Sequence, residues 1–130
     1  MEKIVKWNPF NNYEKRRVYC EGVHDDYEGF RILLSAKENT SSMLHLKFEN
    51  ALMYQNRDES YLSCHSSKEG AFDFPHAFYN IENSELVAKF HSDSSEAYAH
   101  LAIKHFAIYT CNDCIDVLSV EEPLAENLNE

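Results

Sequence analysis

Hydrophobic and polar residues alternate along much of the chain. The alternation is clean in residues 43–49, where Leu44, Leu46 and Phe48 are separated by His45 and Lys47. Successive side chains of a strand point to opposite faces of a sheet, so a period of two predicts a strand with one buried face.

The clearest single element is a hairpin near the C-terminal end, at residues 104–120. Two runs rich in aromatic and β-branched residues flank the turn-forming pair Asn112-Asp113, an order that predicts a β-hairpin. Phe106 and Ile108 fall on one face of the first arm, and the other face also carries apolar residues. We therefore expect the hairpin to occupy a central or well-covered position in a sheet.

Shorter apolar runs between polar turns predict the remaining strands, at residues 4–7, 17–23, 30–36 and 61–64. Residues 51–54 are expected to continue the strand at residues 43–49 after a bend at Asn50. Residues 55–60 break the apolar pattern. Residues 72–79 are aromatic but contain Pro75, which favours an edge strand or an irregular segment. The connections are too short for repeated βαβ crossovers. The predicted fold class is therefore α+β, with a mainly antiparallel sheet of five to seven short strands.

One helix is predicted at residues 84–91. Asn83 and Ser84 are both suitable N-cap residues, and the helix carries one apolar stripe that we expect to pack on the sheet. The stripe consists of Leu86, Val87 and Phe90. Residues 97–102 fit either a second short helix or the lead into the hairpin.

The length and composition predict one globular domain over residues 1–123, followed by a frayed acidic tail over residues 124–130. The hydrophobic share of 44% fits a globular protein, and 3 Gly and 3 Pro argue against a loop-dominated chain. No apolar run approaches the roughly 18 residues that a membrane span needs. The first residues also lack the apolar core of a signal peptide, so a cytoplasmic location is expected.

The net charge of -10 is unevenly distributed. Residues 1–65 carry 9 basic and 10 acidic residues, whereas residues 66–130 carry 3 basic and 12 acidic ones, a net charge of -9. Nucleic acids and anionic membranes attract positive charge, so both are disfavoured as partners. A basic protein partner fits the charge, because electrostatic steering would speed the encounter.

Cys111 and Cys114 have the spacing with which two thiolates bind one zinc ion. The further ligands available are the adjacent pair Cys64 and His65, and Cys20, none of which has a second metal-like spacing. A redox role needs the first cysteine at a helix N-terminus, whereas here the motif lies in a hairpin. Two ordinary turn-flanking cysteines are the favoured interpretation, and no metal or other cofactor is predicted.

Two acidic clusters suggest chemistry only weakly. Residues 24–28 combine a histidine with carboxylates that suit a hard cation, but they lack the EF-hand pattern and are interpreted as a solvated acidic turn. Asp58 and Glu59 are candidate general bases, but an ion pair with Arg57 or Arg31 is the favoured interpretation. No nucleophile elbow, phosphate-binding loop or zinc-protease motif is present, so no enzyme activity and no catalytic residue are predicted.

The acidic second half carries tyrosines among its carboxylates, a combination that suits an Arg/Lys-rich protein partner. A charged surface that only keeps the protein soluble is the equally favoured alternative. The predicted partner-binding residues are Tyr98, Tyr109, Asp113, Asp116, Glu121 and Glu122.

In its size, acidity, sheet content and lack of catalytic motifs over the whole chain, the protein resembles the small acidic immunity proteins of bacterial toxin systems. The resemblance implies a protein that binds one cognate basic toxin, such as a nuclease, and inhibits it by covering its active site. Two alternatives remain open: a small ligand-binding or accessory domain of unknown partner, and a metal or redox protein that uses Cys111 and Cys114.

Overall fold

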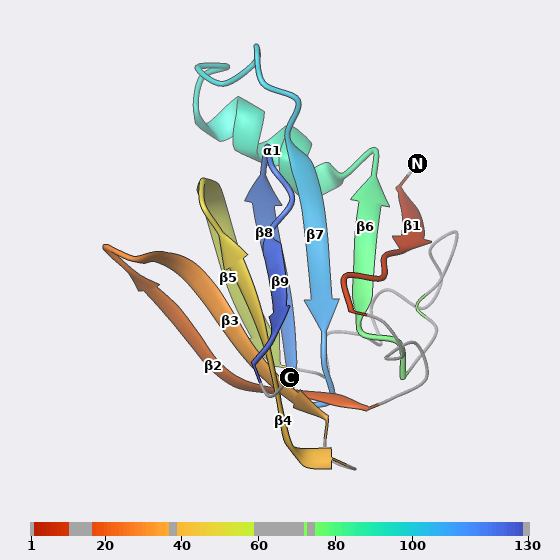
Figure 1. The fold of residues 1–130 in the computed structure, drawn as a ribbon. Helices are drawn as coiled ribbons and strands as arrows, with labels where there is room; N and C mark the ends of the chain where they lie inside the picture. Colours follow the sequence, from red (N-terminus) through yellow and green to blue (C-terminus); the bar gives the residue numbers. More distant parts are fainter. Residues whose placement is uncertain (1, 11–16, 37–38, 59–71, 73–74, 129–130) are drawn as a thin grey trace.

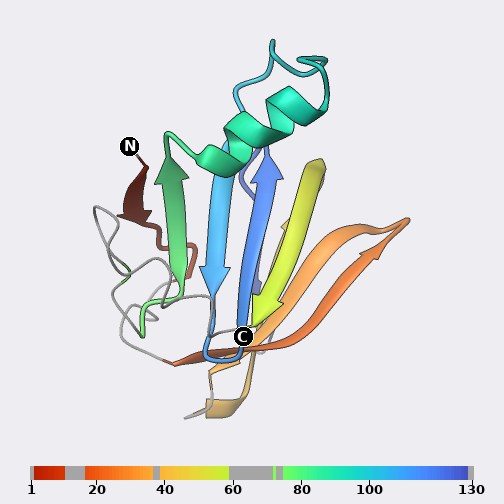
Figure 2. The same ribbon diagram turned by 180° about the vertical axis from the view of Figure 1, so that it is seen from behind.

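Two antiparallel sheets and one helix make up the part of the chain that the structure, a computed structural model, describes: residues 2–10, 17–36, 39–58, 72 and 75–128. The five-stranded sheet has the spatial order β1 (Lys3–Lys6), β6 (Phe78–Glu82), β7 (Lys104–Tyr109), β8 (Asp113–Ser119) and β5 (Ala51–Asp58). The four-stranded sheet has the order β2 (Val18–Asp26), β3 (Gly29–Ala36), β4 (Asn39–Phe48) and β9 (Leu124–Asn127). Figures 1 and 2 show the two sheets with the helix α1 (Glu85–Asp93) at one end of the larger one.

The α+β class and the antiparallel pairing are therefore confirmed. The described residues contain nine strands, more than the five to seven expected. One addition is β9, because residues 124–127 pair with β4 and place Leu124 opposite Lys47. The prediction of a frayed tail is wrong for these residues, since backbone hydrogen bonding to the edge of β4 orders a segment whose side chains are mostly exposed.

The core lies between the two sheets and is built by the alternation seen in the sequence. Ile32 of β3 stands opposite Leu46 of β4, and both side chains are buried. Phe106 of β7 stands opposite Val117 of β8 and faces the same layer. Burying an aliphatic or aromatic side chain of this size stabilises the fold by about 1.5–3 kcal/mol, so this layer supplies most of the driving force.

The β7–β8 hairpin is confirmed, with Tyr109 opposite Cys114 and a central place in the five-stranded sheet. Its outer face carries a second apolar cluster, to which Ile4 of β1 and Ala107 of β7 contribute. Both faces of the hairpin are covered by other parts of the protein, which explains why its sequence carries apolar residues on both faces.

The turn of this hairpin also ties the two sheets together. The Cys111 N–H donates to the carbonyl of Val18, with 2.9 Å between nitrogen and oxygen. The Asn112 side chain pairs with the backbone of Cys20, accepting its N–H at 2.9 Å and donating to its carbonyl at 3.2 Å. Asn112 thus satisfies backbone groups at the edge of β2, a role that its turn position alone did not reveal.

The helix begins where its capping pattern predicts. The Ser84 hydroxyl accepts the Val87 N–H at 3.1 Å, and the Glu2 carboxylate accepts the Glu85 N–H at 2.8 Å. The predicted stripe of Leu86, Val87 and Phe90 is only half-buried. Residues 97–102 contain turns and a bend but no second helix, so they form the lead into the hairpin. No helix among the described residues is long and apolar enough to cross a membrane.

Two boundaries in the middle of the chain differ from expectation. Strand β5 is a separate strand of the other sheet, not a continuation of β4, and it extends to Asp58. Its Gln55 and Arg57 side chains hydrogen-bond Asp116 of β8. Phe78 and Tyr79 begin β6, which lies between β1 and β7, so the prediction of an edge or irregular segment is wrong for them. The predicted strand at residues 61–64 lies outside the described residues.

Candidate functional site

A buried carboxylate lies on the outer face of the five-stranded sheet, beneath the start of the helix. Asp116 of β8 is 0% exposed, and its two oxygens are shared among several neighbours. The partners and distances are Tyr109 Oη at 2.6 Å, His105 Nε2 at 2.7 Å, Arg57 Nη2 at 3.0 Å and Gln55 Nε2 at 3.2 Å. The side chains come from three adjacent strands, since β8 lies between β7 and β5.

These neighbours keep Asp116 ionised. Burial alone would raise the pKa of this carboxyl group, because the charged form loses hydration. The hydrogen bonds from His105, Tyr109 and Arg57 outweigh burial and hold the pKa below its ordinary value of 3.8. Asp116 is thus a buried anion with its own set of donors.

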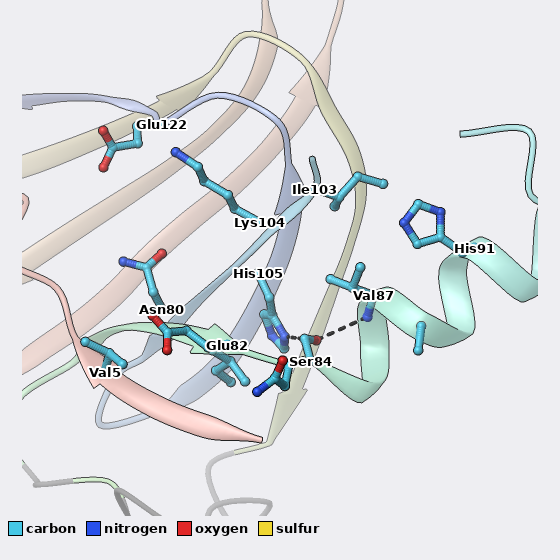
Figure 3. A pocket seen from close by; sticks show the side chains of 13 residues that line it. Val5, Asn80, Glu82, Ser84, Val87, His91, Ile103, Lys104, His105 and Glu122 are labelled. Carbon is cyan, nitrogen blue, oxygen red and sulfur yellow. Dashed lines mark hydrogen bonds between the residues drawn. The ribbon is translucent and has the colours of Figure 1, made fainter. Parts of the chain in front are cut away.

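The network extends from Asp116 to the helix cap through His105, as Figure 3 shows for its Ser84 end. His105 Nδ1 lies 2.7 Å from Ser84 Oγ. Asp116 needs a donor at Nε2, so in the neutral ring Nδ1 is the acceptor and the Ser84 hydroxyl donates to it. The same hydroxyl accepts the Val87 N–H, so both its donor and its acceptor functions are used.

Ser84, His105 and Asp116 are hydrogen-bonded in the same sequence as the serine, histidine and aspartate of a catalytic triad, in which the histidine activates the serine as a nucleophile. A cavity of about 720 Å³ lies beside it, lined by Ser84, His105 and apolar residues that include Val87 and Ile103 (Figure 3). A nucleophile must present its oxygen to a substrate, whereas Ser84 is buried and engaged as a helix cap. The geometry therefore favours a structural network that satisfies Asp116 and fixes the helix.

A second candidate site is the tip of the β2–β3 hairpin, which leans away from β5 in both ribbon views (Figures 1 and 2). Tyr27 at the tip is 97% exposed and lies between the exposed carboxylates of Asp26 and Glu28. The register of β2 and β3 shifts at a β-bulge between Cys20 and Gly22. Bulges bend a strand and increase its twist, which accounts for the direction in which the hairpin leans.

Two further carboxylates, Glu49 and Glu121, lie at the neighbouring β4–β5 turn. Glu49 follows β4 at the corner where the chain crosses to β5, and the neighbouring Asn50 donates to Glu121 at 3.0 Å. We define the acidic corner as Asp25, Asp26, Tyr27, Glu28, Glu49 and Glu121. Two cations lie among its strands: Arg31 pairs with the tip carboxylates, and Lys47 stands opposite Arg31. The corner remains net negative.

The structure separates the residues predicted to bind a partner. Tyr109 is 2% exposed and Asp116 is buried, so the expectation that they lie at the surface is wrong. Both face the helix-covered side of the sheet and hydrogen-bond each other. Tyr79, another tyrosine of the acidic second half, is also buried and packs on Phe72.

The other four predicted residues do not form one patch. Asp113 begins β8 and Glu121 lies two residues beyond its end, so the length of the strand, about 20 Å, separates them. Tyr98 is 39% exposed and packs on Phe90 near the end of the helix. Glu122 lines the large cavity, so only Glu121 belongs to the acidic corner.

The cysteine motif adopts a structural position. Cys111 is half-buried in the turn and Cys114 is buried in β8. Burial, followed by the charge of Asp113, raises the pKa of Cys20 to about 11, so this thiol stays protonated at neutral pH. Within the described residues, no group of three or more histidine, cysteine or carboxylate side chains is placed to hold a metal. Cys64 and His65 lie outside those residues.

The roles expected of the two candidate general bases, Asp58 and Glu59, stay predictions. Glu59 and the side chain of Asp58 lie outside the described residues. Of the two arginines expected to pair with them, Arg57 pairs with Asp116 and Arg31 pairs with Asp26. The expected ion pair of Asp58 or Glu59 with Arg57 or Arg31 therefore stays a prediction.

Sequence reasoning missed the exposed aromatic residues. Tyr27 was included in a solvated acidic turn, and the signal that marks it is an aromatic residue at the apex of a turn, where no strand neighbour can cover it. Tyr54 was assigned to a strand, and only the splaying of the sheets exposes it.

A comparison of the chain with protein families, curated proteins and solved structures found no match.

Proposed function

We propose that this chain is an acidic protein-binding protein whose acidic corner docks on a basic protein surface. The observation that carries the proposal is Tyr27, a large ring that is almost fully exposed among carboxylates at the end of a projecting hairpin. An exposed tyrosine offers a rigid, amphipathic anchor with little rotamer entropy to lose on binding.

The tip is braced before any partner arrives. The Asp26 side chain accepts the Glu28 N–H at 2.9 Å and the Arg31 guanidinium at 2.7 Å. Gly29 follows with a φ of +104°, a left-handed conformation that closes the turn and that other residues rarely adopt. A pre-ordered tip loses less entropy on association, which favours affinity.

The resemblance to immunity proteins suggests a finer proposal for the partner. A nuclease toxin must be basic where it holds its substrate, because phosphate groups are neutralised by Lys and Arg. The acidic corner would compete for those groups and exclude the substrate. The support for this step is the chain's charge and the placement of its exposed carboxylates around Tyr27.

The test is affinity capture from lysate of the source cells with three immobilised proteins: the wild type, Tyr27→Ala and Tyr98→Ala. Tyr98 is the matched control, because it is an exposed tyrosine outside the acidic corner. The proposal expects one basic protein on the wild type and on Tyr98→Ala, and its loss on Tyr27→Ala. Equal recovery on all three, or the loss of the partner only with Tyr98→Ala, would contradict it.

The inhibitor role is tested separately with the captured protein. Its expression alone should arrest growth of a host, and co-expression of this chain should restore growth in proportion to binding. If the captured protein is harmless when expressed alone, the toxin-inhibitor role is rejected, and this chain stands only as a protein that binds a basic partner.

A second candidate function, serine hydrolysis, is favoured by the Ser84–His105–Asp116 hydrogen-bond chain beside a large cavity. A fluorophosphonate probe followed by mass spectrometry decides it. An adduct on Ser84 that disappears in His105→Gln would support hydrolysis, whereas an unlabelled protein matches the capping role.

A further inference from the structure

A pocket of about 360 Å³ opens at the acidic corner, between the β2–β3 hairpin and the start of β5. Its walls combine aromatic rings with carboxylates. The rings are Phe30, Phe48 and Tyr54, and the carboxylates are Asp25 and Glu49. This volume falls at the lower end of the range typical of small-ligand pockets.

Strand register explains why these residues meet. Asp25 stands opposite Phe30 on the β2–β3 pair, and directly opposed residues share a face of the sheet. Phe30 in turn stands opposite Phe48, and both rings face the layer between the sheets. Asp25 is therefore a carboxylate on the inner face, at the point where that face reaches solvent.

The second sheet supplies the other wall. Tyr54 of β5 stands opposite Val117, a core residue, so it also faces inward. Its ring centroid lies 4.2 Å from that of Phe30, and the ring planes are inclined by 30°. Tyr54 is nevertheless 39% exposed, because the hairpin leans away from β5 and leaves the end of the core layer open.

The two carboxylates of the pocket are not used within the protein. Neither the Asp25 carboxylate nor the Glu49 carboxylate makes a hydrogen bond or an ion pair with any residue in the described part of the chain, and both residues are exposed. This differs from the tip itself, where Asp26 and Glu28 pair with Arg31.

We propose that this pocket receives one arginine side chain of a basic partner protein. A guanidinium is planar, stacks on aromatic faces and donates hydrogen bonds in a fork to carboxylates. Tyr54 would provide the stacking face, and Asp25 and Glu49 would accept from the two edges of the fork. A lysine ammonium is a compact, strongly hydrated point charge and matches a flat aromatic wall less well.

This inference rests on the proposed function and specifies which group of the partner is recognised. Tyr27 and the tip carboxylates would then contact the surface around that arginine. The pocket supplies specificity, since a correctly placed arginine can enter it, whereas the exposed charges attract any cationic surface.

The test is titration of the isotopically labelled full chain with an amidated hexa-arginine peptide at low salt, with an amidated hexalysine peptide as the comparison. The proposal expects amide shifts at Glu49 and Ala51 and upfield shifts of the arginine δ-methylene protons, because the protons would lie over an aromatic ring. Glu49→Gln should weaken binding of the arginine peptide about tenfold, because a neutral amide oxygen accepts a weaker hydrogen bond from a guanidinium than a carboxylate does.

The variants separate the pocket from the rest of the corner. Tyr54→Leu should weaken binding while Tyr54→Phe retains it, because only phenylalanine keeps an aromatic face for the guanidinium. Both variants keep an apolar side chain beside Phe30, so the packing of the core is preserved. Binding that is lost in Tyr27→Ala but unchanged in Tyr54→Leu and Glu49→Gln would reject the pocket and leave the proposed function standing. Equal binding of hexalysine, or no binding of hexa-arginine, would also overturn the arginine assignment, while affinity capture judges the proposed function independently.

Discussion

The rings of Tyr54 and Phe30 lie 4.2 Å apart and join strand β5 of one sheet to strand β3 of the other. Phe30 is buried and Tyr54 is partly exposed, so the contact marks the place where the core layer reaches the surface. The unpaired carboxylates of the neighbouring pocket lie at this same boundary. The contact between Tyr54 and Phe30 therefore joins the two sheets and also forms part of the surface that we propose for partner binding.

Removal of the buried anion should strongly destabilise the protein. Asp116→Ala takes a charged partner from Arg57, His105 and Tyr109 at once. Breaking a buried ion pair by deleting one member typically costs about 3–5 kcal/mol, and we expect a loss in that range in urea unfolding. Asp113→Ala is the matched control. A similar loss of unfolding free energy in both variants would show that the hydrogen bonds of Asp116 add no particular stability.

The same carboxylate should make the fold sensitive to acid. Its pKa is lower in the folded protein than its ordinary value of 3.8. The stability it contributes is therefore fully present above about pH 4 and is lost as the pH falls through the folded-state value. Thermal unfolding between pH 2 and 6 should show this loss in the wild type and a shallower loss in Asp116→Asn. Parallel pH profiles would contradict the assignment.

The helix cap should contribute modestly to stability. Ser84→Ala removes the acceptor for the Val87 N–H and the donor to His105, and a lost N-cap typically costs about 0.5–2 kcal/mol. Ser94→Ala, at the other end of the helix, tests whether the loss is specific to the network, because its hydroxyl contacts only the last carbonyls of the helix. Chemical denaturation compares the two variants, and an equal loss would argue against a special role for Ser84.

The two cysteines of the turn motif should respond differently to serine. Cys111 is half-buried, so Cys111→Ser should change stability by less than about 0.5 kcal/mol. Cys114 is fully buried, and a hydroxyl there needs a partner, so Cys114→Ser should cost about 1–3 kcal/mol. Elemental analysis of the wild type is expected to find no stoichiometric zinc. Zinc near one equivalent, lost in both variants, would establish a metal site instead.

Much of the fold could be predicted from local patterns. The alternation of Leu44, Leu46 and Phe48 fixed which face of β4 is buried, and the hairpin around Asn112 was evident from its turn residues. Strand β9 could not be predicted in this way. Its side chains are mostly exposed, so no burial pattern marks it, and its order depends on the free edge of β4.

The candidate site was less accessible to sequence reasoning. Asp116 looked like one surface acid among many, because nothing in the local sequence shows that Arg57 lies across the strand pair. The pocket joins Asp25, Glu49 and Tyr54, which lie far apart in the chain and meet only through the tertiary arrangement of the two sheets. Tyr27 could have been found from its position at the tip of an acidic turn.

The most direct test of the proposed function is the association rate of the captured basic protein with the wild type, Glu28→Lys and Glu82→Lys. Both substitutions make the same charge change at an exposed residue, but only Glu28 belongs to the acidic corner. We predict that Glu28→Lys slows association while Glu82→Lys has little effect. Raising the salt from 0.1 to 1 M should slow the wild type as well, since the screening length falls from roughly 10 Å to about 3 Å. An association rate indifferent to salt, or equally sensitive to both substitutions, would contradict binding through the acidic corner.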